Sequence, residues 1–322
     1  MAGLGPVITM RFSPATFLRA GLLCCLAATL SAAPKIGVLL KGRSAFWAAV
    51  EKGAIASGQQ LGAEVVVKSP VSESDISVQI QLLNALAAQG AEAIVIAPIN
   101  KEALAIPIAS IAIKGVKIIV IDTQLTGKAA PVFVGTDQEA SGQAAGRLLA
   151  KLVGDTDEVS FFKHSQSSGA TALRETGALA TFRETHPQNT VHGDIYASTE
   201  AGAEPGQAQL LLKQHPATKA ILASGTPGTL AMLKLLQDQK LAGSIKLVGF
   251  GFNLNPDVAA ALASGALSGW IAQLPGEVGA KGVAAAVSLL MGETVPPVIN
   301  TDFVVITKDN LNDPKVQALL AM

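Results

Sequence analysis

The sequence predicts an α/β protein made of two doubly wound parallel-sheet (Rossmann-like) lobes. Short segments that are almost continuously apolar alternate with longer segments in which apolar residues recur at helical spacing. This alternation fills the first half of the chain and is repeated in the second half. The length of 322 residues also suggests more than one domain, because single hydrophobic cores usually stop growing at about 250–300 residues.

The first half shows the alternation from its start. Apolar strands are expected over 36–40, 63–67, 93–97 and 116–121. Helices are expected between them, over about 46–61, 76–87 and 102–114. Gly90 and Gly115 follow the second and third of these helices, as is common at helix ends. Strands that are apolar along their whole length are typical of parallel sheets with helices on both faces.

The second half repeats the pattern. Strands are expected over 159–162, 190–196, 220–223, 246–251 and 268–273. Helices are expected over about 138–153, 172–185, 206–215, 227–239 and 275–291. In doubly wound sheets ligands bind at the carboxyl ends of the strands, so the residues directly after each strand are candidates for the site.

Residues 1–33 are typical of a secretory signal peptide. Arg11 and Arg19 provide positive charge, an apolar run covers 20–30, and small residues follow. The run is too short to cross a bilayer, which takes about 20 residues. Secretion into the periplasm is therefore expected.

The end of this segment sets the expected cleavage site. We expect cleavage after Ser31 or Ala32, because Pro34 disfavours a cut after the residue before it. Met10 is an alternative start that would give a shorter positive region. The other interpretation, a buried N-terminal helix, is disfavoured because Pro34 would stop that helix just before the first strand.

The chain has two cysteines, Cys24 and Cys25, and both lie in the predicted signal peptide. Leu22 and Leu23 precede them where a lipoprotein signal needs small residues, so no lipid anchor is expected. Two cysteines cannot form a disulfide framework or a four-ligand zinc site. The mature chain would have no thiol, which suits an oxidising compartment.

Composition and motifs exclude several function classes. Lys plus Arg and Asp plus Glu both total 24, and this balance argues against a nucleic-acid surface. The turn after the first strand reads Lys41-Gly42-Arg43-Ser44, without the glycine pattern of a dinucleotide site. Phosphate-loop, zinc-protease and hydrolase-elbow motifs are also absent. No catalytic residue, metal or cofactor is predicted.

Two further features have ordinary structural interpretations. His186 and His215 each precede a proline and are expected at helix ends or turns. The segment 225–228, Gly-Thr-Pro-Gly, could hold an anion at a helix N-terminus. The alternative is that Thr226 caps the helix and Pro227 is its first residue.

Seven short stretches, in order along the chain, carry a family resemblance. They are Phe46-Trp47, Ile121-Asp122, 134–137, 173–177, 248–250, 271–275 and 303–308. From Pro34 to Met322 the chain resembles the ribose-binding-protein-like solute receptors of ABC importers, the type I periplasmic binding proteins.

This resemblance implies two lobes joined by three crossovers that close over a ligand. The N-terminal lobe is expected to comprise 34–136 and 275–302. The C-terminal lobe is expected to comprise 137–274 and 303–322. Each lobe thus takes its last segment from beyond the second crossover.

The resemblance also implies site residues. Asp122 matches the family's hydroxyl-accepting aspartate, and the alternative is a turn residue. Arg174 matches the pocket arginine, and the alternative is a surface arginine paired with Glu175 or Glu200. Phe46 and Trp47 match the family's paired aromatics, of which one is expected in the core.

Two further positions lie at the crossovers. Gln273 matches the family's pocket glutamine at the second crossover, with backbone capping as the alternative. Asp137 lies in the matching stretch at the first crossover and is also a candidate ligand residue.

Four positions depart from the family's ribose receptors. Thr123 stands where they have an arginine, Gly225 where they have an asparagine, Gly251 where they have an aspartate, and Thr199 where they have an aromatic residue. Ribose is therefore disfavoured as the ligand. The two glycines are expected to leave room for a bulkier or less hydroxylated ligand.

Three cationic or titratable residues follow strands and could face a ligand carboxylate or phosphate. Lys41 and Arg43 follow the first strand, and His164 follows the strand at 159–162. For all three, the alternative is an ordinary loop position. Trp270 is expected to pack in the core or at the hinge.

The leading hypothesis is a secreted, monomeric, non-enzymatic receptor. It would close over a small polar ligand, a monosaccharide or sugar-like polyol, and deliver it to the permease of an ABC importer. One alternative is a ligand-sensing protein that serves an autoinducer, chemoreceptor or sensor kinase. A Lac-repressor-type regulator would need an N-terminal DNA-binding domain of about 50–60 residues, and no motif indicates an α/β enzyme.

Overall fold

The computed structural model describes residues 32–125, 132–166, 168–198, 200, 202–252 and 254–320. Residues 33–322 form one unit. The signal peptide predicted at the N-terminus, with Cys24 and Cys25, lies outside the described residues up to Ser31, and so does Thr199. In the part of the chain that is described, no helix is long and apolar enough for a membrane crossing.

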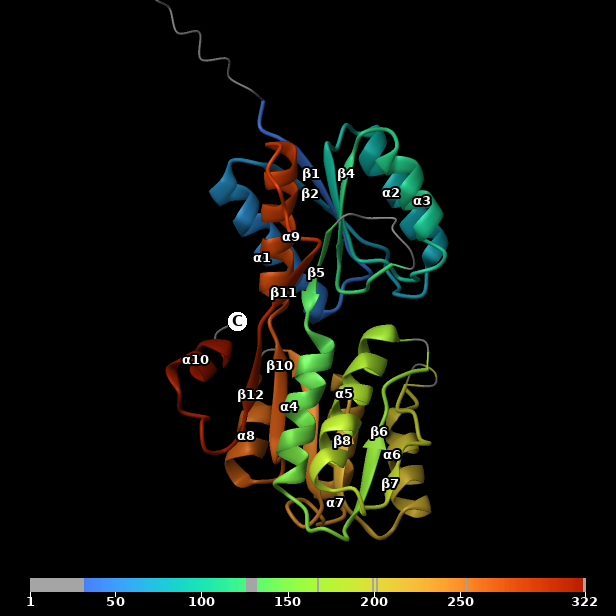
Figure 1. Ribbon diagram of the computed structural model, residues 1–322, viewed down its shortest axis with the longest axis vertical. Coiled ribbons are helices and arrows are strands. Elements are labelled where there is room, and N and C mark those ends of the chain that lie inside the picture. Colours follow the sequence, from blue (N-terminus) through green and yellow to red (C-terminus); the bar gives the residue numbers. More distant parts are fainter. Residues whose placement is uncertain are drawn as a thin grey trace, which may run out of the picture. The chain divides into compact units, whose positions relative to one another are not determined.

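The first sheet has six parallel strands in the order β11-β5-β4-β3-β1-β2. These are β1 (Lys35–Leu39), β2 (Glu64–Lys68), β3 (Ala93–Ile96), β4 (Lys117–Ile121), β5 (Val132–Thr136) and β11 (Val298–Thr301). On one face pack α1 (Ala45–Leu61) and α9 (Pro275–Leu290). On the other pack α2 (Ile76–Ala88) and α3 (Ala105–Ala112) (Figure 1).

The second sheet has the order β12-β10-β9-β8-β6-β7. These are β6 (Glu158–Phe162), β7 (Val191–His192), β8 (Thr218–Ala223), β9 (Lys246–Phe252), β10 (Gly269–Gln273) and β12 (Phe303–Ile306). One face is covered by α4 (Gln138–Ala150) and α5 (Gly169–Thr185). The other is covered by α6 (Glu204–Gln214), α7 (Thr226–Asp238) and α8 (Pro256–Ser264). The short α10 (Pro314–Gln317) follows β12.

The two-lobe α/β fold predicted from the sequence is confirmed. Each sheet places its first strand between the second and the third, so the winding direction reverses between β1 and β3 and between β6 and β8. Ligands bind at such reversals, at the carboxyl ends of the strands. Lys41 and Asp122 follow strands of the first sheet, while His164 and Gly225 follow strands of the second.

The chain passes between the sheets three times, from β5 to α4, from β10 to α9 and from β11 to β12. At the third passage a single residue, Asp302, separates the two strands. β11 is parallel to β5, whereas β12 is antiparallel to β10. The parallel strands of the second sheet end at the crossovers. β12 begins at a crossover, so it runs in the direction opposite to them.

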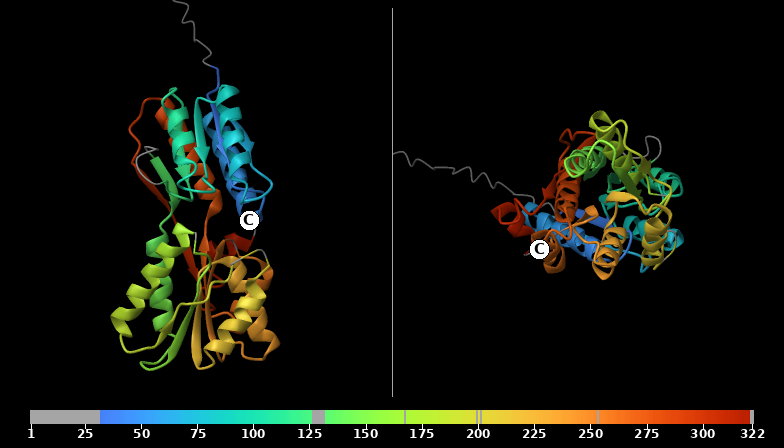
Figure 2. Two further views of the ribbon diagram at one scale, coloured as in Figure 1. Left: turned by 90° about the vertical axis from the view of Figure 1, so that its right-hand side faces the viewer. Right: turned by 90° about the horizontal axis from the view of Figure 1, so that it is seen from below.

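Glycines allow two helix pairs to approach closely. A methyl group on Gly142 of α4 would lie 2.0 Å from the carbonyl oxygen of Arg174 on α5. A methyl group on Gly53 of α1 would lie 2.0 Å from the carbonyl oxygen of Gly276 on α9. α4 and α5 run side by side (Figures 1 and 2). This close packing fixes the position of α5 along α4, and α5 carries Arg174.

Several elements differ from the sequence-based expectation. The strands β5 and β11 and the helices α8 and α10 were not predicted. β7 is two residues long instead of seven, because the chain leaves the sheet edge at Gly193 and touches it again only where Tyr196 pairs with Lys163. α3 begins at Ala105 because the Asn100 side chain accepts from the amides of Glu102 and Ala103 and holds a turn there.

Candidate functional site

The carboxyl ends of the first sheet are held together by a buried glutamine. The side chain of Gln79 on α2 is fully buried. Its Nε2 donates to the carbonyls of Leu40 at 3.1 Å and Ala97 at 2.7 Å, and its Oε1 accepts from the amide of Ile99 at 2.9 Å. The segments after β1 and β3 are therefore fixed next to each other, and they carry the first part of the site.

Lys41, Asp122 and Thr123 form a cluster in the first lobe. Lys41 Nζ donates to Asp122 Oδ2 and to Thr123 Oγ1, each at 2.6 Å, and Thr123 Oγ1 donates to Asp122 Oδ2 at 3.1 Å. The side chains of Lys41 and Asp122 are only 15% and 18% exposed. Lys41 is thus not a solvated loop residue, and it balances the charge of Asp122.

Asp122 occupies a turn as well as this cluster. Its φ of 62° lies in the left-handed region, which non-glycine residues rarely adopt. Such backbone conformations concentrate at functional sites, where the surrounding contacts maintain them. The bonds from Lys41 and Thr123 provide those contacts.

The two aromatic residues of α1 divide their roles. Trp47 is 4% exposed and belongs to the core, which confirms that one of the pair packs inside. Its Nε1 donates to Glu73 Oε1 at 2.8 Å, and Lys41 Nζ lies 5.6 Å from its ring centroid. Phe46 is half-buried and meets both Trp47 and Phe252 of the second lobe edge to face, at centroid distances of 4.9 and 5.3 Å.

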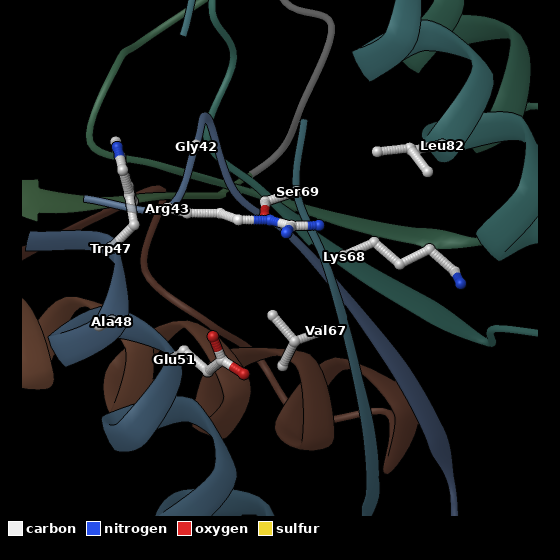
Figure 3. Close-up of a pocket in the computed structure, with 9 residues that line it drawn as sticks. All are labelled: Gly42, Arg43, Trp47, Ala48, Glu51, Val67, Lys68, Ser69 and Leu82. Atoms are coloured by element: carbon white, nitrogen blue, oxygen red, sulfur yellow. The ribbon is translucent and has the colours of Figure 1, made fainter. Parts of the chain in front are cut away.

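Behind Trp47, a cavity of about 520 Å³ lies between α1 and β2. Figure 3 shows the Arg43 side chain extending toward Ser69, while Glu51 and Val67 lie on the other side of the cavity. Arg43 is exposed, so it occupies the solvated position that was the alternative for it. This cavity does not contain Lys41 or Asp122.

In the second lobe, Arg174 is buried, with 3% of its surface exposed. Its Nε and Nη2 both donate to Gln138 Oε1, at 3.2 and 2.6 Å, and its Nη1 donates to the carbonyl of Ser224 at 2.5 Å. The guanidinium lies over the ring of Phe250 at 4.3 Å. The alternative of a surface arginine is therefore wrong.

Burial lowers the pKa of Arg174 to about 10, although the carboxylates of Asp122 and Glu175 act in the opposite direction. Arg174 stays positively charged at neutral pH. Among the described residues, no carboxylate forms an ion pair with it. Its direct partners are the neutral oxygens of Gln138 and Ser224.

His164 lies beside Arg174 in a second polar network. Glu175 Oε1 accepts from Ser224 Oγ at 2.5 Å and from the amide of His164 at 3.2 Å. His164 Nδ1 is 3.4 Å from Ser198 Oγ, which donates to Glu204 Oε1 at 2.8 Å. Burial and the charge of Arg174 lower the pKa of His164 below its usual 6.5, although Glu204 acts against the shift. The imidazole is therefore neutral at pH 7.

The two departing glycines do not leave the open room that the sequence suggests. A methyl group on Gly225 would lie 2.8 Å from Nδ1 of His164. A methyl group on Gly251 would lie 2.0 Å from the indole of Trp270, which is 1% exposed as expected for a core residue. The expectation of free space at these positions is wrong, because an imidazole and an indole ring fill it.

Side-chain hydrogen bonds connect the three crossovers. Gln138 Nε2 donates to Gln273 Oε1 at 3.2 Å, which joins the first crossover to the second. Asn300 Nδ2 donates to Asp137 Oδ2 at 3.2 Å, which joins the third to the first. Asp137 Oδ1 also caps α4 by accepting from the amide of Ala140 at 2.9 Å. Gln273 and Asp137 therefore lie at the hinge, where Gln138 also holds Arg174.

Other expectations have simple outcomes. His186 and His215 are the C-caps of α5 and α6, so their helix-end positions are confirmed. Gly225, not Thr226, is the N-cap of α7, and its position offers no side-chain cap. In the described ranges, no three metal-ligating side chains gather.

A cavity of about 550 Å³ lies next to Asp122 and Thr123 on the side of the crossovers. Its lining includes Gln138 at the start of α4 and Leu173, which precedes Arg174 on α5. It is lined by both lobes and shares Asp122 with the Lys41 cluster.

Sequence reasoning missed the residues that support Arg174. Gln138 and Ser224 accept its N–H groups, and Glu175 in turn accepts from the hydroxyl of Ser224. A partial signal was available, since Gln138 directly follows the crossover residue Asp137 and Glu175 directly follows Arg174. Their partners, however, come from positions 36 and 49 residues away in the sequence.

A family profile described as "Periplasmic binding protein domain" matches residues 36–294. This chain belongs to that family. The ribose import binding protein of Escherichia coli is 27% identical to this periplasmic binding protein over 267 residues, covering 82% of this chain and 86% of the relative. The D-allose-binding periplasmic protein of Escherichia coli is 24% identical over 261 residues, covering 78% and 83%. The family consists of solute-binding proteins.

Solved structures of solute-binding proteins agree with this assignment. One from Agrobacterium radiobacter, in complex with D-arabinose, matches this periplasmic binding protein with a TM-score of 0.81 and 29% identity, covering 90% of this chain and 99% of its own. Another from Agrobacterium vitis, bound with α-D-tagatopyranose, matches with a TM-score of 0.80 and 27% identity, covering 89% and 98%. The two-lobe fold is thus shared over nearly the whole of these proteins.

Proposed function

We propose that the protein is a periplasmic sugar receptor that closes its two lobes over a monosaccharide or sugar-like polyol. The observation that carries this proposal is the buried Arg174, which forms no ion pair within the described part of the chain and is fixed by Gln138 and Ser224. A guanidinium has five N–H donors, and three of them have acceptors among the described residues. The remaining donors suit ligand hydroxyls, because buried donors need partners.

The opposite lobe complements this arginine. Asp122 offers a carboxylate and Lys41 an ammonium group, so hydroxyls that both donate and accept find partners there. Phe46 supplies an aromatic surface for the apolar C–H face of a sugar ring. Asp122 lines the same cavity as Gln138, the residue that holds Arg174, which supports a site shared by the two lobes.

Ribose is a poor candidate within this class. Thr123 has replaced an arginine of the ribose receptors, and His164 and Trp270 occupy the space beside Gly225 and Gly251. The second lobe thus has a neutral imidazole beside Gly225, and beside Gly251 it has a buried indole where the ribose receptors have a carboxylate. A site with fewer polar partners favours a ligand with fewer hydroxyls on that side.

A thermal-shift panel tests the proposal. The protein without residues 1–33 is heated with D-ribose, D-allose, D-arabinose, D-fucose and D-tagatose, each at a concentration far above the expected Kd. A ligand at 100 times its Kd stabilises the folded state by about 2.7 kcal/mol, so at least one sugar should raise the Tm by several degrees. If none of a wider panel of sugars, polyols and sugar acids does so, the proposal fails.

Delivery to a membrane permease is the second half of the proposal. It predicts that cells lacking this protein lose high-affinity uptake of the sugar found in the panel, and that export of the protein restores it. Uptake of the radiolabelled sugar measures this. Unchanged uptake in the deletion strain would remove the transport role and leave the binding role standing.

A further inference from the structure

The cavity of about 550 Å³ beside Asp122 is lined by some of the candidate ligand residues and not by others. Asp122, Thr123 and Asp137 line it, whereas Lys41, Phe46 and Arg174 lie outside its lining. Asp122 therefore stands at a boundary between the Lys41–Arg174 region and a second space. A volume of this size is within the range of about 300–1,000 Å³ that small-molecule pockets have.

Apolar side chains from both lobes form a wall of this second space. They are Leu125, Phe133, Leu173 and Val298. Leu173 is 52% exposed and Val298 is 48% exposed, which is unusual for large apolar side chains. A single exposed apolar residue needs no explanation, but several that line one cavity indicate a binding surface.

Phe133 is held next to Asp122. The ring of Phe133 lies where a side chain on Gly135 would be, since a methyl group there would be 2.8 Å from its Cζ. The same methyl position is 3.6 Å from Cα of Asp122. The ring of Phe133 and the backbone of Asp122 therefore both lie beside Gly135, and both residues line the cavity.

Polar groups complete the lining, and Lys101 and Glu139 are the charged residues among them besides the two aspartates. Gln124 and Asn300 provide amides, and the Asp137 carboxylate is already engaged by Asn300 and by the amide of Ala140. A mixture of aromatic, aliphatic and amide groups suits a ring that has an apolar face and a polar rim.

We propose that the ligand is a two-ring glycoside. Its first ring binds between Asp122 and Arg174, and its glycosidically linked second ring occupies the cavity against Phe133, Leu173 and Val298. This inference rests on the proposed sugar-receptor function and defines its substrate class. The second ring is either another sugar or an aryl aglycone, and both share the chemistry that the wall recognises.

Isothermal titration calorimetry tests the inference. The monosaccharide with the largest thermal shift is compared with its phenyl glycoside and with disaccharides that contain it. At least one two-ring compound is expected to bind about tenfold more tightly than the monosaccharide, because the wall buries additional apolar area. A gain for the phenyl glycoside alone identifies an aglycone, and a gain for a disaccharide alone identifies a second sugar.

A matched pair of variants locates the second ring. Leu173→Ala is expected to remove most of the tenfold gain while leaving monosaccharide affinity within about twofold. Leu179→Ala is the control, since Leu179 is a 39% exposed leucine on the same helix, outside the cavity lining. It is expected to bind both compounds as the unaltered protein does.

The possible failures can be told apart. If the monosaccharide binds and every two-ring compound binds equally or more weakly, the inference is overturned and the sugar-receptor function stands. If the gain exists but survives Leu173→Ala, the placement of the second ring is wrong. If neither monosaccharides nor glycosides bind, the proposed function itself fails.

Discussion

At the scale of single residues, Arg174 is positioned by neutral acceptors before any ligand is present. Two of its N–H groups share Gln138 Oε1 and a third reaches the carbonyl of Ser224. A lysine could not make this forked set of bonds, because its ammonium is a compact point charge. Arg174→Lys should therefore lower sugar affinity by about 10- to 100-fold, measured by calorimetry.

The control is a second arginine on the same helix. Arg183 donates to the carbonyls of Pro187 and Asn189 at the far end of α5. Arg183→Lys should leave sugar affinity unchanged. Equal losses in both variants would show that the helix, rather than the guanidinium of Arg174, is being disturbed.

His164 gives the stability of the protein a dependence on pH. Its pKa in the folded state is below the usual 6.5, so the unfolded chain binds this proton more readily than the folded protein does. The stabilising contribution is complete above pH 6.5 and is lost as pH falls toward the lowered folded pKa. Urea unfolding at pH 7.5 and 5.0 should show a smaller difference in unfolding free energy for His164→Gln than for the unaltered protein. An equal or larger difference in the variant contradicts this assignment.

Gly251 is required by the indole of Trp270. A methyl group there would lie 2.0 Å from the ring, so Gly251→Ala forces the indole to move. Overpacking of this kind costs about 1–3 kcal/mol, which the urea midpoint would report. The second substitution Trp270→Phe should recover part of the loss.

Gly206 on α6 serves as the control for Gly251, because a methyl group there would meet nothing within 4 Å. Gly206→Ala is expected to leave the midpoint unchanged or to raise it slightly. If Gly251→Ala behaves in the same way, the ring does not occupy the space beside Gly251.

At the scale of secondary-structure elements, the contact between α4 and α5 couples stability to the site. A methyl group on Gly142 would collide with the backbone oxygen of Arg174. Because backbone cannot yield as a flexible side chain does, Gly142→Ala should displace α5 from α4. We expect a loss of about 1–3 kcal/mol in unfolding free energy together with weaker sugar binding. A lower free energy of unfolding with unchanged sugar affinity would show that α5 moves without moving Arg174.

The elements also show what local patterns can predict. β3 is fully apolar and β4 is apolar after Lys117, and such continuous apolar runs predict strands well. β11 has only one fully buried residue, so its pattern carries no such signal. α8 was predictable in principle, since Asn255 caps it, Pro256 begins it and Gly265 ends it with a positive φ of 79°.

The candidate site also has features that the sequence predicts and features that it does not. The cluster around Asp122 and the buried state of Arg174 follow from strand ends and from the family resemblance. The filling of the space beside Gly225 and Gly251 does not, because a single sequence gives no sign of which distant ring replaces a lost side chain. The packing of β6, β8, β9 and β10 next to one another decides which ring lies beside each glycine.

At the scale of the whole molecule, the mature protein should differ from the printed chain at its N-terminus. Intact mass of protein purified from the periplasmic fraction is expected to show a chain that begins at Ala32 or Ala33. Because Cys24 and Cys25 are then removed, this protein should show no thiol in a colorimetric assay under denaturing conditions. A full-length mass or two titratable thiols would contradict the predicted signal peptide.

The exchange of strands at the third crossover has a consequence for how the protein is made. β11 completes the edge of the first sheet and β12 completes the edge of the second, and both come from the end of the chain. A ribosome must therefore finish nearly the entire polypeptide before either lobe has all of its strands. Pairings between distant parts of a chain also form slowly. Neither sheet of this protein is therefore complete until the last strands of the chain have been made.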